Sequence, residues 1–310
     1  MTLSPASSSA PRLFYYFLLG SVVLSLGFNW PILDKAVEVV PPLWLMTFRL
    51  WGGALVGFAM NVLVGKRPSL PRQDWKIVAV LGVFRLAAIF FFVFYALQIL
   101  PPGRSGILVW SSTLWAVPIA VIFLGERMSK LQVNGLLVGV VGLGMVLEPW
   151  TIAVSEPRII LGYLMLLGAA LSGAWTTVYI RAHRWGGTAL ASTPWQMLCG
   201  GVPALAAALA IDGFPDIRWT WGTGFLVGYQ MTLAGPLAVW AHLEALRHIP
   251  AISVNLTLMA TPVVALLASW WLVDEQLGLP IVLGLALITA GVASNVLGDR
   301  TMRPIRSGLT

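Results

Sequence analysis

The stretch KIVAVLGVFRLAAIFFFVFYALQI, residues 76–99, decides the fold class. After its first residue it carries a single charge, Arg85, and its length suits the ~20 residues that cross a hydrocarbon layer. Similar apolar runs follow one another between residues 13 and 297. Only 10% of the 310 residues are charged, against roughly 25% in soluble domains. The sequence therefore predicts an integral membrane protein in which lipid replaces water as the solvent.

Charges, Pro-Gly turns and apolar windows together predict ten transmembrane helices in an all-α fold. We expect them at residues 13–33, 42–64, 76–99, 103–124, 130–148, 158–181, 189–211, 220–246, 250–273 and 278–298. Residues 1–12 are rich in Ser, Ala and Pro and are predicted to form a disordered cytoplasmic tail. Residues 299–310 are predicted to form a basic cytoplasmic tail.

The distribution of lysine and arginine predicts the orientation, because positive residues near the ends of spans stay in the cytoplasm. With the N-terminus inside, the cytoplasmic segments hold Arg12, Lys66, Arg67, Arg72, Lys76, Arg127, Lys130, Arg181, Arg184, Arg247, Arg300, Arg303 and Arg306. The opposite side holds Lys35, Arg104, Arg158 and Arg218. Both termini are therefore predicted to be cytoplasmic, and the chain is expected to span the inner membrane.

The second half of the sequence repeats the first. A shift of 149 positions superposes Ala96-Leu97 on Ala245-Leu246, Pro101 on Pro250, Ala116 on Ala265, Glu126 on Glu275, Gly135 on Gly284 and Gly142 on Gly291. A shift of 151 pairs Trp44 with Trp195, and one of 147 pairs Leu24-Ser25 with Leu171-Ser172. The repeats, 13–148 and 158–298, each contain five predicted spans, so the second should enter the membrane from the opposite side.

The order of these motifs resembles the drug/metabolite transporter superfamily, in particular its ten-helix EamA-type exporters. The similar features are an Ala-Leu pair, a Pro-containing turn, Gly125-Glu126-Arg127 and a Gly-rich fifth helix. The second copy departs from this pattern with Asp274-Glu275. Within the superfamily the sequence is most similar to the YddG-type exporters of aromatic amino acids. The resemblance implies export of amino acids, preferably aromatic, by a central cavity that opens alternately to each side.

Two arginines lie deep within predicted spans and are the first candidates for a substrate site. Arg49 lies about seven residues into the second helix and Arg85 about nine into the third, roughly 10–14 Å deep. A charge at that depth costs roughly 2.5–3.5 kcal/mol, so each guanidinium should face a cavity or a partner. One interpretation is attraction of a substrate carboxylate. The alternative is a structural hydrogen-bond hub for backbone carbonyls.

All twelve carboxylates fall at predicted helix ends or in loops, which restricts the function. An exporter of lipophilic cations should need a buried carboxylate, so anionic or zwitterionic substrates are favoured. A multidrug or nucleotide-sugar carrier stays an alternative, as does an integral-membrane lipid or prenyl transferase. Transferase chemistry would require acidic residues or histidines that lie close together, whereas in this sequence they are spread along the chain. We therefore predict no catalytic residue, metal or cofactor.

The remaining candidates for substrate contact are Asn29, Phe92, Trp110, Trp175, Tyr229, Trp240, His242 and Asn255. The aromatic rings would stack on an aromatic substrate, or merely fill space between helices. His242 would relay protons or pack as a neutral side chain, and the two asparagines would bind substrate or satisfy backbone groups freed by nearby prolines.

Four prolines interrupt predicted helices and would act as hinges or as static kinks: Pro31, Pro118, Pro236 and Pro262. Glu126 and Glu275 are interpreted as turn-stabilising residues, and the Gly135-Gly139 spacing as a site of close helix packing. The expected partners are membrane lipid and a small-molecule substrate such as an amino acid. No nucleic acid is expected, and the chain is expected to be a monomer.

Overall fold

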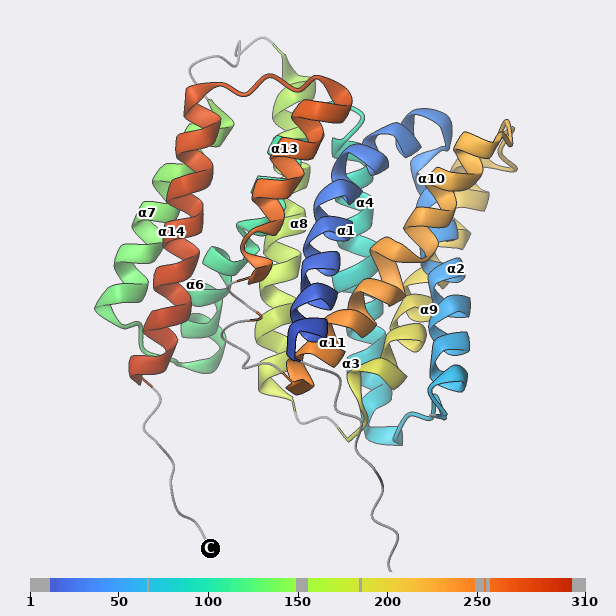
Figure 1. Cartoon of the computed structure of the whole chain (residues 1–310), viewed down its shortest axis with the longest axis horizontal. Helices are drawn as coiled ribbons and strands as arrows, with labels where there is room; N and C mark the ends of the chain where they lie inside the picture. Colours follow the sequence, from blue (N-terminus) through green and yellow to red (C-terminus); the bar gives the residue numbers. More distant parts are fainter. Residues whose placement is uncertain are drawn as a thin grey trace, which may run out of the picture.

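Helices are the only regular structure in the residues that the computed structural model describes, which are 12–65, 67–148, 156–183, 186–248, 254 and 257–302 (Figure 1). The α-helices are α1 (Arg12–Val39), α2 (Pro42–Leu63), α3 (Trp75–Val80), α4 (Ile89–Ala96), α5 (Pro102–Trp110), α6 (Ser112–Leu124), α7 (Lys130–Leu147), α8 (Pro157–Ala182), α9 (Ala189–Ala207), α10 (Trp221–Met231), α11 (Ala238–His248), α13 (Thr261–Val273) and α14 (Leu279–Met302). A 3-10 turn, η1 (Arg72–Asp74), precedes α3. Three π-helical segments are η2 (Leu81–Ala88), η3 (Ala208–Asp212) and η4 (Leu233–Leu237).

Eight helical stretches of the described chain are long and apolar enough to cross a membrane, and α13 is a shorter apolar helix. This confirms the prediction of an all-helical, multi-span membrane protein. The predicted end of the first helix at residue 33 is wrong, because α1 continues to Val39. Leu33, Ala36 and Val37 are buried on one face of this extension, so packing carries the helix past its first charged residues.

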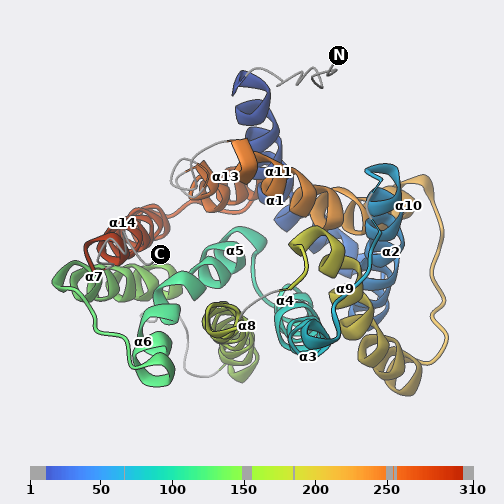
Figure 2. The same ribbon diagram turned by 90° about the horizontal axis from the view of Figure 1, so that it is seen from below.

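The helices form a bundle in which segments far apart in the sequence lie side by side. α7 and α14 pack together at one edge, while α2 and α9 pack together near the opposite edge (Figures 1 and 2). Between these pairs, α1 packs against α13, and α6 packs against α8. The start of α1 and the end of α14 lie at the same end of the bundle, the lower end in Figure 1.

Glycine allows the close approach of α7 and α14. A Cβ atom added at Gly135 would lie 2.7 Å from the backbone oxygen of Gly291, and one added at Gly142 would lie 2.7 Å from that of Gly284. Side chains at these positions would force the helices apart. The close packing expected from the Gly135-Gly139 spacing is therefore present, since Gly139 also contacts Gly291.

Three predicted helices are interrupted. The helix expected at 250–273 has a turn at residues 259–260, and α13 begins after it at Thr261. The helix expected at 103–124 divides at a turn around Ser111, where the Ser111 hydroxyl donates a 2.6 Å hydrogen bond to the backbone oxygen of Leu108. The helix expected at 220–246 breaks between α10 and α11, where Gly235 adopts non-helical dihedral angles beside Pro236. A proline removes a backbone donor and clashes with the preceding turn, which accounts for the break beside Pro236.

Candidate functional site

The break between α10 and α11 frees backbone carbonyl groups inside the bundle, and side chains from the first half of the chain bind them. The Ser25 hydroxyl donates a 3.0 Å hydrogen bond to the oxygen of Leu233. Nη2 of Arg49 donates one of 3.0 Å to the oxygen of Ala234. These bonds matter because an unpaired backbone group within a membrane costs several kcal/mol.

The Arg49 guanidinium contacts both this region and residues of the first half of the chain. Its Nη1 donates to Oε1 of Gln230 and, at 3.5 Å, to Oδ1 of Asn29. The guanidinium carbon lies 4.3 Å from the centre of the Phe90 ring, a cation–π contact. Arg49 is only 6% exposed. These contacts match the structural alternative for Arg49, while its attraction of a substrate carboxylate stays a prediction.

Arg85 contrasts with Arg49, although both arginines lie deep in their helices. Among the residues that the structure describes, none forms a hydrogen bond or an ion pair with the Arg85 guanidinium. Arg85 is exposed in the structure of the protein. His242 lies near enough to interact electrostatically with the Arg85 guanidinium. Arg85 is thus a cation with donors free for a ligand.

The backbone around Arg85 is also unusual. Residues 81–88 form the π-helical segment η2, and π-helical turns are frequent at functional sites. The segment packs closely on α9: a Cβ atom at Gly82 would overlap the backbone oxygen of Gln196, and one at Gly200 would overlap that of Gly82. Two glycines therefore allow α9 to lie against the segment that carries Arg85.

Aromatic rings gather beside η2. The rings of Phe84 and Trp175 make an edge-to-face contact at 5.2 Å between centroids, and Trp175 stacks on Tyr179 at 5.2 Å. Trp175 therefore packs on Phe84, the residue that directly precedes Arg85 in η2. Among the predicted aromatic candidates, the structure brings Trp175 close to this part of η2.

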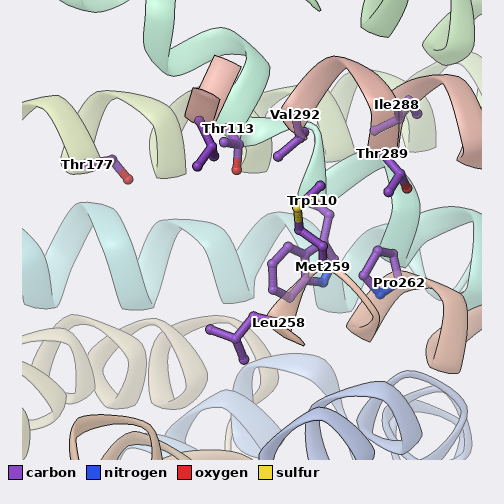
Figure 3. Close-up of a pocket in the computed structure, with 10 residues that line it drawn as sticks. Trp110, Thr113, Thr177, Leu258, Met259, Pro262, Ile288, Thr289 and Val292 are labelled. Atoms are coloured by element: carbon purple, nitrogen blue, oxygen red, sulfur yellow. The ribbon is translucent and has the colours of Figure 1, made fainter. Parts of the chain in front are cut away.

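A cavity of about 350 Å³ lies between α5, α6, α8, α14, the start of α13 and the residues that precede α13 (Figure 3). Trp110 forms part of its wall, as a cavity role for that residue requires. Most of the lining is apolar, but three threonines contribute hydroxyl groups: Thr113, Thr177 and Thr289. This combination suits a ligand with an apolar body and a few polar atoms.

Sequence reasoning missed most of the cavity wall. Thr113, Thr177, Thr289, Met259 and Ile288 were not among the candidates, because such residues are ordinary in membrane helices and their spacing carries no signal. Pro262 also lines the cavity. It lies in the first turn of α13, where a missing N–H costs nothing, so the chain breaks before it and does not kink through it.

The other candidates lie in varied surroundings. Tyr229 joins the Arg49 region, since its hydroxyl donates a 2.6 Å hydrogen bond to the backbone oxygen of Ser25. Phe92 packs on α8 at Gly168, and Trp240 packs against a cluster formed by α1 and α11. Asn255 lies outside the described residues. Pro31 and Pro118 lie inside the continuous helices α1 and α6.

The family model for EamA-like transporters matches this chain twice, over residues 13–148 and 160–297. The chain belongs to the EamA-like transporter family. Its members are transporters and not enzymes, so the transferase alternative is set aside. The predicted resemblance to EamA-type exporters is confirmed.

Relatives of this EamA-like transporter include proteins whose names describe a substrate. It is 28% identical over 225 residues to the "Aromatic amino acid exporter YddG" of Ancylobacter novellus, covering 72% of this chain and 75% of that protein. It is 25% identical to the "Probable amino-acid metabolite efflux pump" of Escherichia coli K12, covering 93% of this chain and 96% of that protein. A solved crystal structure aligns with a TM-score of 0.64 over 90% of this chain and 97% of its own, at 21% identity. At that identity the alignment supports the fold alone.

Proposed function

We propose that this EamA-like transporter exports amino acids, preferably aromatic ones, across the inner membrane by alternating access. The observation that carries the proposal is Arg85, a deep guanidinium without a partner in the described part of the chain. A guanidinium matches the geometry of a carboxylate, which every amino acid carries. Trp175, which packs on Phe84, and the Trp110 cavity would then receive an aromatic side chain.

We further infer that the two halves are inverted repeats with both termini in the cytoplasm. The contacts between helices support this, because a contact that a helix of one half makes with the other half has a counterpart in which the two halves change places. α2 of the first half packs against η4, and α9, its counterpart in the second half, packs against η2. The π segments also correspond: a shift of 149 carries Arg85 to Ala234, which lies within η4.

A carrier of other metabolites within the same family is the second candidate. The carboxylates of the described residues lie at helix ends or in connections, apart from those in the last turns of α1 and in α11. None of them lies next to Arg85 in the structure as an ion-pair partner. A cation that has no neighbouring carboxylate among the described residues favours an anionic or zwitterionic substrate over a cationic drug.

The test is uptake by proteoliposomes of labelled phenylalanine, tryptophan and threonine and of a lipophilic dication, with and without a pH gradient. We expect phenylalanine and tryptophan to be transported best and the dication least. Arg85→Gln should raise the KM for phenylalanine by about tenfold or more, since it removes a charge-assisted hydrogen bond. Arg158→Gln is the matched control, because Arg158 is exposed at the start of α8. Indifference to all amino acids would overturn the substrate proposal.

A further inference from the structure

Glu275 joins the two halves of the chain at the upper end of the bundle in Figure 1. It lies in the connection between α13 and α14, and its carboxylate binds the first turn of α5. The Gly103 N–H donates to Oε2 at 2.7 Å, and the Arg104 N–H donates to Oε1 at 3.1 Å. Amides in the first turn of a helix have no acceptor within the helix, so the carboxylate supplies one from the other half.

The surroundings of Glu275 add further contacts to these hydrogen bonds. Glu275 is 7% exposed, and burial raises its pKa even though the two backbone donors and Arg104 lower it. Nη1 of Arg104 forms a 2.7 Å ion pair with Oε2 of Glu148 at the end of α7. Together these bonds tie α5, α7 and the α13–α14 connection at one end of the protein.

Glu126, which the 149-residue shift superposes on Glu275, has a different environment. It follows α6 at the lower end of the bundle in Figure 1. Its side chain is 41% exposed and pairs with Nη2 of Arg181 at 2.9 and 3.1 Å. An exposed pair of this kind contributes little stability. Equivalent residues of the two repeats are thus buried at one end and exposed at the other.

We propose that Glu275 and Glu126 are alternating latches of the transport cycle, and that the structure shows the state in which the Glu275 end is latched. In the opposite state Glu275 leaves α5, and Glu126 becomes buried at its own end. This inference rests on the proposed inverted repeats and alternating access. With the termini in the cytoplasm, the Glu275 end is the external end.

The latch can be tested by thiol labelling without any substrate. Cys199 is the only cysteine of the chain, so Cys199→Ala provides a thiol-free background. Ser105→Cys then places a thiol on α5 where the native side chain is fully buried beside the latch. The measured quantity is the rate of labelling by a membrane-impermeant maleimide added from the external side.

Glu275→Gln keeps the size of the side chain but leaves one of the two amides without an acceptor oxygen. We expect it to raise the labelling rate by about tenfold. Glu126→Gln, the matched control, should lower that rate or leave it unchanged, because Glu126 would stabilise the opposite state. The proposal is overturned if Glu275→Gln leaves the rate unchanged, or if Glu126→Gln raises it equally.

A second variant covers the case in which Glu275→Gln fails to fold. A Cβ atom at Gly103 would lie 2.7 Å from Oε2 of Glu275, so Gly103→Ala displaces the carboxylate while keeping every charge. It should raise labelling as Glu275→Gln does, whereas Gly144→Ala, with no atom within 4 Å of the added Cβ, should not. An unchanged rate in Gly103→Ala overturns the latch. Labelling that changes as expected in a protein that transports no amino acid would overturn only the substrate.

Discussion

Nη2 of Arg49 donates a 3.0 Å hydrogen bond to the backbone oxygen of Ala234, 185 positions further along the chain. Ala234 is the residue onto which the 149-residue shift carries Arg85. One deep arginine of the first half therefore stabilises the broken helix of the second half, at the position equivalent to the other deep arginine. The two arginines, alike in sequence, have different surroundings in the structure.

This difference predicts that replacing Arg49 destabilises the protein much more than replacing Arg85. Arg49→Leu would leave the acceptors Ala234 O, Gln230 Oε1 and Asn29 Oδ1 without their donor, at about 1–3 kcal/mol for each buried group. We expect the midpoint of thermal unfolding in detergent to fall by roughly 5–10 °C. Arg85→Leu, which removes no partner among the described residues, should change it by about 2 °C or less. Equal losses in the two variants would contradict this assignment.

A second prediction concerns the packing of α9 on η2. Gly200→Ala places a Cβ atom onto the backbone oxygen of Gly82, and backbone cannot rotate away as a side chain can. The expected loss of stability is about 1–3 kcal/mol. Gly144→Ala is the control, because its added Cβ meets no atom within 4 Å. Thermal unfolding of both variants by intrinsic fluorescence measures the difference, and unchanged stability in Gly200→Ala would show that the two segments separate readily.

The sequence predicted the membrane-spanning segments well because hydrocarbon thickness imposes a length that apolar runs reveal. It predicted less about helix geometry. Pro236 indicated a break, but the π segment around Arg85 packs on α9 through Gly82 and Gly200, which lie far apart in the sequence. Local sequence does not encode such contacts.

The candidate site was predictable only in part. Depth in the membrane identified both Arg49 and Arg85, yet it could not separate them, since the acceptors of Arg49 lie 20, 181 and 185 positions away. Trp110 was found as a deep aromatic residue. The threonines beside it in the cavity were not, because a threonine on a membrane helix most often donates to the preceding turn, as Thr177 and Thr289 do here.

A third prediction uses substrate selectivity to test the cavity. If the Trp110 cavity receives the substrate side chain, Trp110→Leu should raise the KM for tryptophan by up to about tenfold, the upper end of the value of one aromatic contact. The KM for threonine should change by less than about threefold. Trp271→Leu is the matched control, since Trp271 is 68% exposed near the end of α13. A parallel increase for both substrates would indicate a general defect.

The final prediction concerns movement at the break between α10 and α11. Pro236→Ala restores a backbone donor, and it removes the ring that prevents helical geometry around Gly235. A more continuous helix would compete with Arg49 for the Ala234 carbonyl and stiffen the segment beside η2. We expect the maximal transport rate to fall by about tenfold while substrate affinity is retained. The control is Pro203→Ala, because Pro203 lies inside α9 without breaking it. Equal effects of the two variants, or a Pro236→Ala effect confined to affinity, would show that this break is a static kink.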